Sequence, residues 1–350
     1  MGTSGSVAGR FAKGTDCSVH FALRAAGQSN PSPSRPFSRE SPDSLFQMCK
    51  SQSFLACVAL TGLLFVPVFA QQHPGIVAPG AKLELLADGF QFTEGPAADA
   101  AGNVYFTDQP NNKILKWSVD GKLSVFLEDA GRSNGLFFGP DGNLFACADL
   151  DNELWRISPK GVTMVLVSHY GGKKLNGPND LWVDPQGGIY FTDPFYKRDY
   201  WMRGEMEQDG QHVYYFSPEK KLTRVIDDLL QPNGIIGTPD GKRLYIADIK
   251  AKKTYVYDTG PGGELSGKRL AAESGSDGLT LDNEGNLYVT GKGVTVFDPD
   301  GRQIDHIEVP ERWTANVTFG GSERDTLFIT AMDSLYSIRT RVRGAGASSE

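Results

Sequence analysis

Apolar and polar positions alternate in short runs along most of the chain from about residue 83 onward, and turn residues separate the runs. Six runs share one plan, in which valine, leucine or isoleucine is followed by an aromatic residue and then by aromatic, β-branched or small residues. Runs of this kind, bounded by turn residues, predict β-strands joined by hairpins. The six are Val104–Thr107, Leu144–Cys147, Ile189–Thr192, Leu244–Ala247, Leu287–Thr290 and Leu327–Thr330.

A polar residue stands at the same place ahead of each run. The six polar starts are Glu94, Asn134, Asn179, Asn233, Asp277 and Asn316. They lie 40, 45, 54, 44 and 39 residues apart, and in five repeats a glycine follows eight positions later, whereas the sixth has Arg324 there. This period is typical of a four-stranded propeller blade. The sequence therefore predicts an all-β fold, a six-bladed β-propeller with four-stranded blades.

The polar starts are predicted to converge. In a propeller the innermost strands run beside the central channel, so residues at the start of that strand in every blade meet near its mouth. Two carboxylates and four amides would gather there. Asparagine also opens turns, and this alternative stays open for Asn134 and Asn233, but it does not explain the acidic Glu94 and Asp277 at the same register.

The third repeat is the longest because an aromatic and cationic segment, Phe195–Arg203, follows its second strand. Propeller loops of this kind often cover the channel mouth, so the segment is a candidate substrate wall or lid. We expect Tyr196 and Trp201 to contact substrate. Packing between blades is the alternative.

The N-terminal region does not fit the repeat. Residues 1–47 are rich in Ser, Pro, Gly and Arg, which indicates a disordered leader or a mis-assigned start. Residues 48–70 have the basic start, apolar stretch and small residues of a secretory signal peptide. We expect Met48 to be the true start and the protein to be exported, periplasmic or extracellular. A membrane anchor and an organelle-targeting leader are the alternatives.

The remaining boundaries follow from the repeat. A linker is expected at 71–82, the propeller at 83–340 and a frayed tail at 341–350. Because an unpaired sheet edge invites aggregation, the strand-like segment Lys82–Leu86 is expected to complete the sixth blade beside Ser334–Ile338.

Charge and cysteine content narrow the range of possible partners and functions. Without residues 1–70 the chain has 29 Lys/Arg and 39 Asp/Glu, a net charge near −10. Such a chain without a basic cluster is a poor partner for nucleic acid or an anionic membrane. Cys147 is the one cysteine beyond residue 70 and lies among apolar neighbours, so we assign it to the core.

The predicted ring of polar starts favours a cation. Two carboxylates in a low-dielectric channel repel each other, so one takes up a proton or a cation binds between them. An all-oxygen set of Glu, Asp and Asn suits Ca²⁺, although another divalent cation is possible, and Zn²⁺ usually brings His or Cys. His169, His212 and His306 are scattered and do not repeat at ligand spacing.

The motifs also resemble a known family. Glu94-Gly95-Pro96, Asn176–Asp180, Pro232-Asn233-Gly234 and Ser276–Leu279, in this order, are similar to motifs of the SMP-30/gluconolactonase family of six-bladed, calcium-dependent lactonases, over roughly residues 83 to 338. The resemblance implies Glu94, Asn179, Asn233 and Asp277 as metal ligands. Asn134 and Asn316 match no family ligand and are left as pocket or substrate-binding residues. Animal members carry arginine at the position of Gly177, so their sugar-acid lactone preference does not transfer, and bacterial gluconolactonase-like members match better.

The resemblance implies hydrolysis of a small-molecule lactone. Calcium would polarise the carbonyl while a carboxylate takes a proton from water. Asp277 is the candidate general base, and a ligand-only role remains the alternative. Other functions stay open: an arylesterase or phosphotriesterase on the same scaffold, a non-catalytic calcium-bound binding module, and, more distantly, a quinoprotein dehydrogenase. The sequence does not indicate an oligomeric state.

Overall fold

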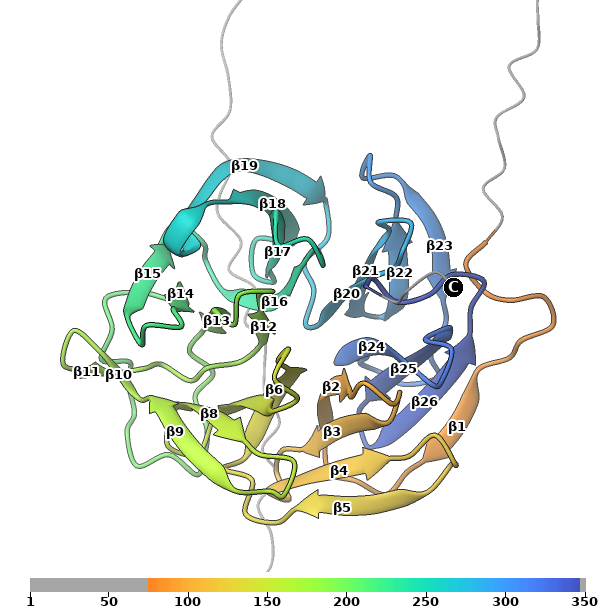
Figure 1. Cartoon of the computed structure of the whole chain (residues 1–350), viewed down its shortest axis with the longest axis horizontal. Helices are drawn as coiled ribbons and strands as arrows, with labels where there is room; N and C mark the ends of the chain where they lie inside the picture. Colours follow the sequence, from red (N-terminus) through yellow and green to blue (C-terminus); the bar gives the residue numbers. More distant parts are fainter. Residues whose placement is uncertain (1–74, 347–350) are drawn as a thin grey trace, which may run out of the picture. The chain divides into compact units, whose positions relative to one another are not determined.

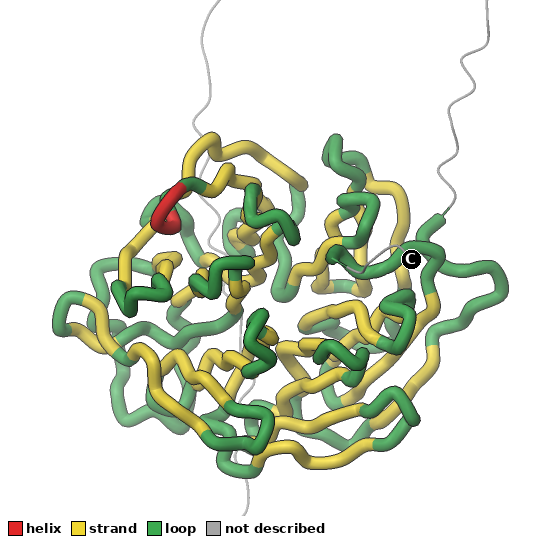
Figure 2. The backbone as a smooth tube through the Cα atoms, in the orientation of Figure 1, coloured by secondary structure: helices red, strands yellow, loops and turns green. Residues whose placement is uncertain are grey.

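The computed structural model describes residues 75–346, which belong to one compact unit of the chain. Six four-stranded antiparallel sheets surround a central axis as the blades of a propeller (Figure 1). Figure 2 shows that this part of the chain consists almost wholly of strands and turns, with one short helical segment, η1 (Pro261–Gly263). The predicted all-β, six-bladed fold is therefore confirmed. Within residues 75–346 no helix is long and apolar enough to cross a membrane.

Each of the first five blades is built from four strands that follow one another in the chain, and their order in the sheet leads from the axis outward. The first two blades are β2 (Thr93–Ala98), β3 (Val104–Asp108), β4 (Lys113–Trp117) and β5 (Leu123–Leu127), then β6 (Ser133–Phe138), β7 (Leu144–Ala148), β8 (Glu153–Ile157) and β9 (Thr163–Val167). A short ribbon, β10 (His169–Tyr170) and β11 (Lys173–Lys174), precedes the third blade of β12 (Leu181–Val183), β13 (Ile189–Asp193), β14 (His212–Phe216) and β15 (Leu222–Ile226). The fourth and fifth blades are β16 (Pro232–Gly237), β17 (Arg243–Asp248), β18 (Lys253–Thr259) and β19 (Leu265–Ala272), then β20 (Leu279–Leu281), β21 (Leu287–Gly291), β22 (Gly293–Phe297) and β23 (Gln303–Ile307).

The sixth blade joins the two ends of the described chain. Its order is β1 (Glu84–Ala87), β26 (Ser334–Arg339), β25 (Thr326–Ala331) and β24 (Asn316–Gly320), with β24 next to the axis. β1 pairs antiparallel with β26, and Glu84 lies opposite Ser337. The expected closure is thus present, and it protects the edge of β26 from pairing with another chain.

A turn of one conformation separates the first two strands of every blade. Five blades place glycine in it with positive φ, for example Gly102 at +90° and Gly285 at +83°. The sixth blade places Arg324 there at φ +57°, and the Arg324 N–H donates to the Gly321 carbonyl at 3.1 Å, as the glycines do in the other blades. The backbone of the divergent sixth repeat therefore follows the common plan, although arginine adopts this conformation less readily than glycine.

Two boundary predictions differ from the structure. The tail was predicted to fray from Arg341, but Val342 is buried, and the Arg341 and Gly344 N–H groups donate to the carbonyls of Ile76 and Arg324. Residues 75–82 do not form a free linker, because Ile76 is also buried and Val77 forms a bridge with Thr340. Each segment covers the other, which is why both are ordered. The predicted leader at 1–47, the signal peptide at 48–70, linker residues 71–74 and tail residues 347–350 lie outside the described residues.

Buried threonines join neighbouring blades near the axis. Thr107 Oγ1 donates to the Asn134 carbonyl at 3.1 Å, and Thr192 Oγ1 donates to the Asn233 carbonyl at 2.8 Å. Both threonines are fully buried at the far end of a second strand, so each hydroxyl satisfies a carbonyl of the next blade. Cys147 occupies the corresponding place in the second blade and is also fully buried, in keeping with its assignment to the core.

Candidate functional site

The polar starts of the repeats are placed by irregularities in the inner strands. In β2 the register shifts between Glu94 and Ala97, and in β16 it shifts between Pro232 and Ile235. A β-bulge adds one residue to one strand and re-aims the side chains beside it. Glu94 lies at the edge of one bulge and Asn233 lies within the other, so the alternation of the strand is broken at the residues that the repeat pattern singles out.

Glu94 is a buried carboxylate, with 3% of its surface exposed. Its Oε2 accepts a hydrogen bond from the Gly95 N–H at 3.0 Å. Burial, followed by the nearby carboxylate of Asp277, holds the pKa of Glu94 well above its usual range. The charge of Asp277 therefore acts on Glu94, and burial together with this repulsion opposes ionisation of Glu94.

Asp277 is held from two sides. Its Oδ1 accepts a hydrogen bond from Asn233 Nδ2 at 2.8 Å, and its Oδ2 accepts one from Trp313 Nε1 at 2.7 Å. Burial raises the pKa of Asp277 to about 6, while these two hydrogen bonds act in the opposite direction. The carboxylate is thus oriented and retains acceptor capacity on both oxygens.

Asn233 links the site to the inserted loop. Its Nδ2 donates to Tyr196 Oη at 2.9 Å as well as to Asp277. Its Oδ1 is buried and has no hydrogen-bond partner among the described residues. A buried amide oxygen without a partner is costly, and a bound cation would satisfy it.

Asn179, the fourth candidate ligand, lies just before β12 and is 5% exposed. Its backbone N–H donates to the Thr192 carbonyl at 2.9 Å, whereas its side chain makes no hydrogen bond within residues 75–346. Two carboxylates, one amide oxygen without a partner and one amide that makes no side-chain hydrogen bond therefore fit a hard cation such as Ca²⁺. The same part of the chain has no group of three or more His, Cys, Asp and Glu placed to hold a metal, so amides are needed to complete this set.

Two further polar side chains, Asp180 and Asn316, lie near these candidate ligands. The second position of the inner-strand motif is glycine in four blades, where an added Cβ would collide with its neighbour: 2.5 Å from Asp180 Oδ1 at Gly135 and 2.0 Å from Asn316 Oδ1 at Gly278. Asp180 fills the space beside Gly135, and Asn316 fills the space beside Gly278. Burial raises the pKa of Asp180 to about 8.

A cavity of about 500 Å³ follows the axis along the inner strands. Asp180 and Asn316 line it, but the four candidate ligands do not. Its wall exposes polar and apolar surface in similar amounts, and every blade contributes an apolar residue: Ala97, Leu136, Leu181, Ile235, Leu279 and Val317. Asn316, predicted to line the pocket, therefore lies on this axial side. Asn134 is 4% exposed, and its carbonyl accepts the hydrogen bond of Thr107.

The inserted loop between β13 and β14 reaches the ligand set through Tyr196 and is anchored on Asp149, at the end of β7. Asp149 Oδ2 accepts hydrogen bonds from Arg198 Nε at 2.8 Å, from Tyr200 Oη at 2.6 Å and from Gln109 Nε2 at 3.2 Å. Trp201 Nε1 donates to the Asp149 carbonyl at 2.7 Å. One buried carboxylate therefore connects three blades. Sequence reasoning missed it, because nothing in the repeat pattern indicates that Asp149 faces a loop 49 residues away.

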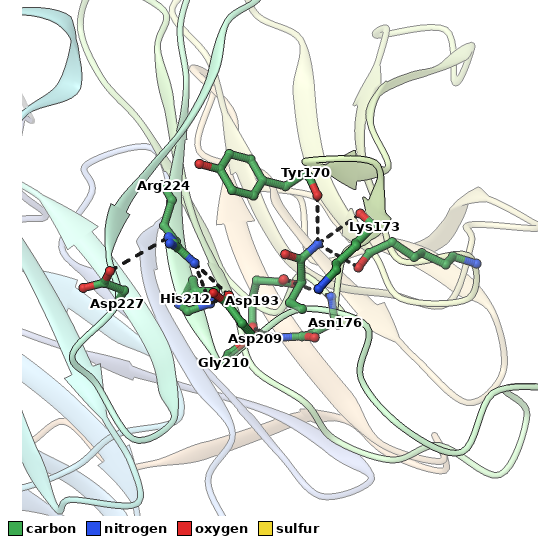
Figure 3. A network of polar contacts seen from close by, with 11 residues as sticks. Tyr170, Lys173, Asn176, Asp193, Asp209, Gly210, His212, Arg224 and Asp227 are labelled. Atoms are coloured by element: carbon green, nitrogen blue, oxygen red, sulfur yellow. Dashed lines mark hydrogen bonds and ion pairs between the residues drawn. The ribbon is translucent and has the colours of Figure 1, made fainter.

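The outer half of the loop is tied down separately (Figure 3). Gln208 Nε2 donates to the carbonyls of Tyr170, Lys173 and Lys174, and Asp209 pairs with Arg224 at 2.8 Å. Asn176 Nδ2 bonds to the carbonyls of Asp193 and Gly210 at 3.0 and 2.8 Å. The loop is thus fixed at both ends beside the candidate ligands.

The Trp201 side chain, which was expected to contact substrate, also packs against Gly177 and Asp149. A Cβ at Gly177 would lie 2.8 Å from Asp149 Oδ1 and 2.9 Å from Trp201 Cη2. Any side chain at Gly177 would displace one of them. The departure from the animal members at this position therefore has a physical basis, since Trp201 and Asp149 occupy the space.

The histidines of the described chain lie outside this site. His212 Nε2 is paired with Asp209 at 2.9 Å, and His306 Nδ1 contacts Thr295 Oγ1 at 2.9 Å. His169 Nδ1 contacts Ser168 Oγ at 2.9 Å. None of the three joins Glu94 and Asp277, which agrees with an all-oxygen ligand set.

Comparison with known proteins identifies the family to which the chain belongs. The model of the SMP-30/gluconolactonase/LRE-like region matches residues 92–333, which include all six polar starts. The chain belongs to this family. A gluconolactonase of Zymomonas mobilis is 30% identical over 311 residues, which cover 79% of this chain and 86% of that protein.

Further members of the family support the assignment. A lactonase of Staphylococcus saprophyticus is 29% identical over 269 residues, covering 71% of this chain and 78% of its own. The solved structure of a gluconolactonase from Xanthomonas campestris superimposes with a TM-score of 0.70 at 30% identity, covering 77% of this chain and 95% of that one. The family membership predicted from the motifs around the polar starts is thus confirmed, and the match extends over nearly the whole propeller.

Proposed function

We propose that this protein is a calcium-dependent lactonase that opens a cyclic ester to a hydroxy acid. One observation carries the proposal: the buried Asp277 carboxylate, whose charge acts on the buried Glu94, is held by Asn233, whose Oδ1 has no partner among the described residues. The names of the family members, which include gluconolactonase and lactonase, supply the reaction class. Glu94, Asn179, Asn233 and Asp277 would hold the cation.

Bound calcium would act as a Lewis acid that polarises the lactone carbonyl. It is too weak a Lewis acid to make hydroxide abundant at neutral pH, so a base is required. In our proposal Asp277 takes the proton from the attacking water. Its carboxylate is oriented by Asn233 and Trp313, and a pKa of about 6 keeps it mostly ionised at neutral pH.

Tyr196 would contribute a hydrogen bond to the substrate. Its hydroxyl oxygen already accepts from Asn233 Nδ2, which leaves its O–H proton free to donate. Burial and the neighbouring Asp277 raise the pKa of Tyr196, so the hydroxyl stays protonated. In the proposed reaction this group donates to an oxygen of the lactone and helps to orient the ring.

The test is a lactonase assay on the parent protein with and without a chelator. The panel would contain aldonolactones, acyl lactones, aryl esters and a paraoxon-type phosphotriester, each corrected for spontaneous hydrolysis. We expect lactone hydrolysis that a calcium chelator abolishes and added calcium restores. Activity confined to aryl esters or phosphotriesters would favour the alternative hydrolase, and calcium binding without any hydrolysis would favour a binding module.

Export is a separate proposal. It rests on the signal-like segment 48–70, which ends ahead of the first strand of the propeller, β1 at Glu84. Cleavage after Ala70 would leave the closure of the sixth blade intact.

A further inference from the structure

A guanidinium group lies next to the candidate calcium site. Arg198 Cζ lies 5.5 Å from the centre of the Tyr196 ring, and the Tyr196 hydroxyl contacts the candidate ligand Asn233. The Arg198 side chain is 25% exposed. Its charge acts on both Glu94 and Asp277. A cation in this position weakens calcium binding by repulsion, so its presence calls for a role of its own.

Four of the five N–H donors of Arg198 make no hydrogen bond within residues 75–346. Nε donates to Asp149 Oδ2 at 2.8 Å, which fixes the plane of the guanidinium. Neither Nη atom has a hydrogen-bond partner within residues 75–346, and neither is among the buried unpartnered atoms, so both are accessible. Tyr200 and Gln109 bind the same Asp149 oxygen and hold it in place. The paired Nη groups therefore form a rigid, open fork.

The neighbouring arginines are engaged elsewhere. Arg132 Nη1 donates to the Pro110 carbonyl at 2.8 Å, and its guanidinium covers the Tyr200 ring at 4.4 Å. Arg203 donates to the Asn176 carbonyl and stacks on Trp201 at 4.6 Å. Both support the loop. Arg198 differs from them because its free donors lie beside the ligand set.

We propose that Arg198 is the anion-binding residue of the active site and that its Nη fork binds the carboxylate of a hydroxy acid. This inference rests on the proposed function, since ring opening of a lactone turns a neutral ester into a carboxylate. Arginine suits this task because its planar fork matches the two oxygens of a carboxylate. Arg198 would thus favour hydroxy acids over uncharged polyols of the same size, and these acids would inhibit as products.

The experiment compares binding of a hydroxy acid and of its uncharged analogue to the calcium-loaded protein. Gluconate and glucitol are the probes, followed by the hydroxy acid of whichever lactone the parent hydrolyses fastest, and calorimetry is the readout. We expect the parent to bind gluconate in preference to glucitol. Arg198→Gln should weaken gluconate binding by about 10- to 100-fold, as expected for loss of a charge-assisted bidentate contact, and should change glucitol binding less than about twofold.

Two matched variants separate charge from geometry. Arg198→Lys keeps the charge without the fork and should fall between the parent and Arg198→Gln. Lys197→Gln removes a positive charge from the adjacent, exposed position of the same loop and should bind gluconate as the parent does.

Calcium affinity distinguishes binding from a merely structural role. If Arg198 binds the ligand, Arg198→Gln should hold calcium as tightly as the parent or more tightly, because a repelling charge is gone. If it only supports the loop, calcium and glucitol binding should weaken together with gluconate binding, which would overturn the proposal. Equal binding of gluconate by parent and Arg198→Gln, or no preference of the parent for gluconate, would overturn it as well. A parent that hydrolyses no lactone would remove the proposed function, while the gluconate titration would still decide the role of Arg198.

Discussion

Asn233 donates one side-chain amide hydrogen to Asp277 across 2.8 Å while its side-chain oxygen, Oδ1, remains buried and without a partner in the described chain. The amide thus orients the acid and offers its oxygen in the same place. Because Trp313 Nε1 holds the second oxygen of Asp277, both oxygens of the carboxylate meet donors. This arrangement requires a carboxylate, since an amide at position 277 would place its NH₂ against Asn233 or Trp313.

The first prediction concerns Asp277→Asn. If Asp277 is the base, kcat for lactone hydrolysis should fall by about 10²- to 10⁴-fold even when calcium saturates the site. The measurement is kcat across a calcium titration, with circular dichroism to confirm folding. Trp313→Phe is the control, because it removes one hydrogen bond and keeps the carboxylate, and it should lose no more than about tenfold. Recovery of near-parental kcat at saturating calcium would leave Asp277 as a ligand only.

The second prediction concerns Glu94→Gln. The glutamine keeps the shape and can still accept the hydrogen bond of Gly95, but it removes one of two repelling charges. We expect calcium affinity to fall sharply. Loss of a residue that only hydrogen-bonds to a metal ligand typically lowers metal affinity by roughly 10- to 100-fold, and loss of Glu94, itself a candidate ligand, should lower it further. In chelator the variant should melt at a higher temperature than the parent. Glu264→Gln, at an exposed carboxylate, should change neither property. Equal calorimetric affinities of parent and Glu94→Gln would exclude Glu94 as a ligand.

The third prediction addresses the bond between blades three and four. Thr192→Val keeps the shape but leaves the Asn233 carbonyl without its donor, which should cost about 1–3 kcal/mol of unfolding free energy. Because this carbonyl belongs to a candidate ligand, calcium affinity should fall as well. Urea denaturation and calcium titration measure the two effects. Thr163→Val, at an exposed strand position, should be neutral in both. An unchanged Thr192→Val variant would mean that the hydroxyl bond does not hold Asn233.

The fourth prediction is a pH dependence. Burial raises the pKa of Asp193 to about 7, although its carboxylate accepts the N–H groups of Asn176 and Gly177. A carboxyl whose pKa is higher in the folded than in the unfolded state stabilises the fold below the unfolded value near 4, and that contribution is lost as pH rises through 7. The stability advantage of the parent over Asp193→Asn should therefore shrink between pH 4 and pH 8. Urea denaturation at several pH values tests this, and a difference that grows with pH would contradict it.

The fifth prediction concerns export. If residues 48–70 act as a signal peptide, N-terminal sequencing of exported protein should find a mature end at or near Gln71. An exported protein that retains residues 1–70 would overturn the proposal.

Much of the fold could be predicted from the sequence because each repeat forms the same strands and turns. The polar starts share one register, so the convergence of Glu94 and Asp277 follows from the period alone. The contacts of Asp149, Trp313 and Arg198 could not be predicted in this way. They come from loops that occur once, and hydrogen bonds between residues distant in sequence leave no periodic signal. The same holds for the tail, whose order depends on burial of Val342 against the far end of the described chain.

The glycines beside the axis have a consequence for engineering. Gly135 and Gly278 are required because Asp180 and Asn316 occupy the space where their side chains would lie. The axis thus has room for only a few side chains at this level. A symmetric propeller made from six copies of one blade could not reproduce the hub: copies of the third blade would crowd six carboxylates together, and copies of the second would leave the axis without Asp180. Divergence among the repeats is therefore a steric requirement of this centre.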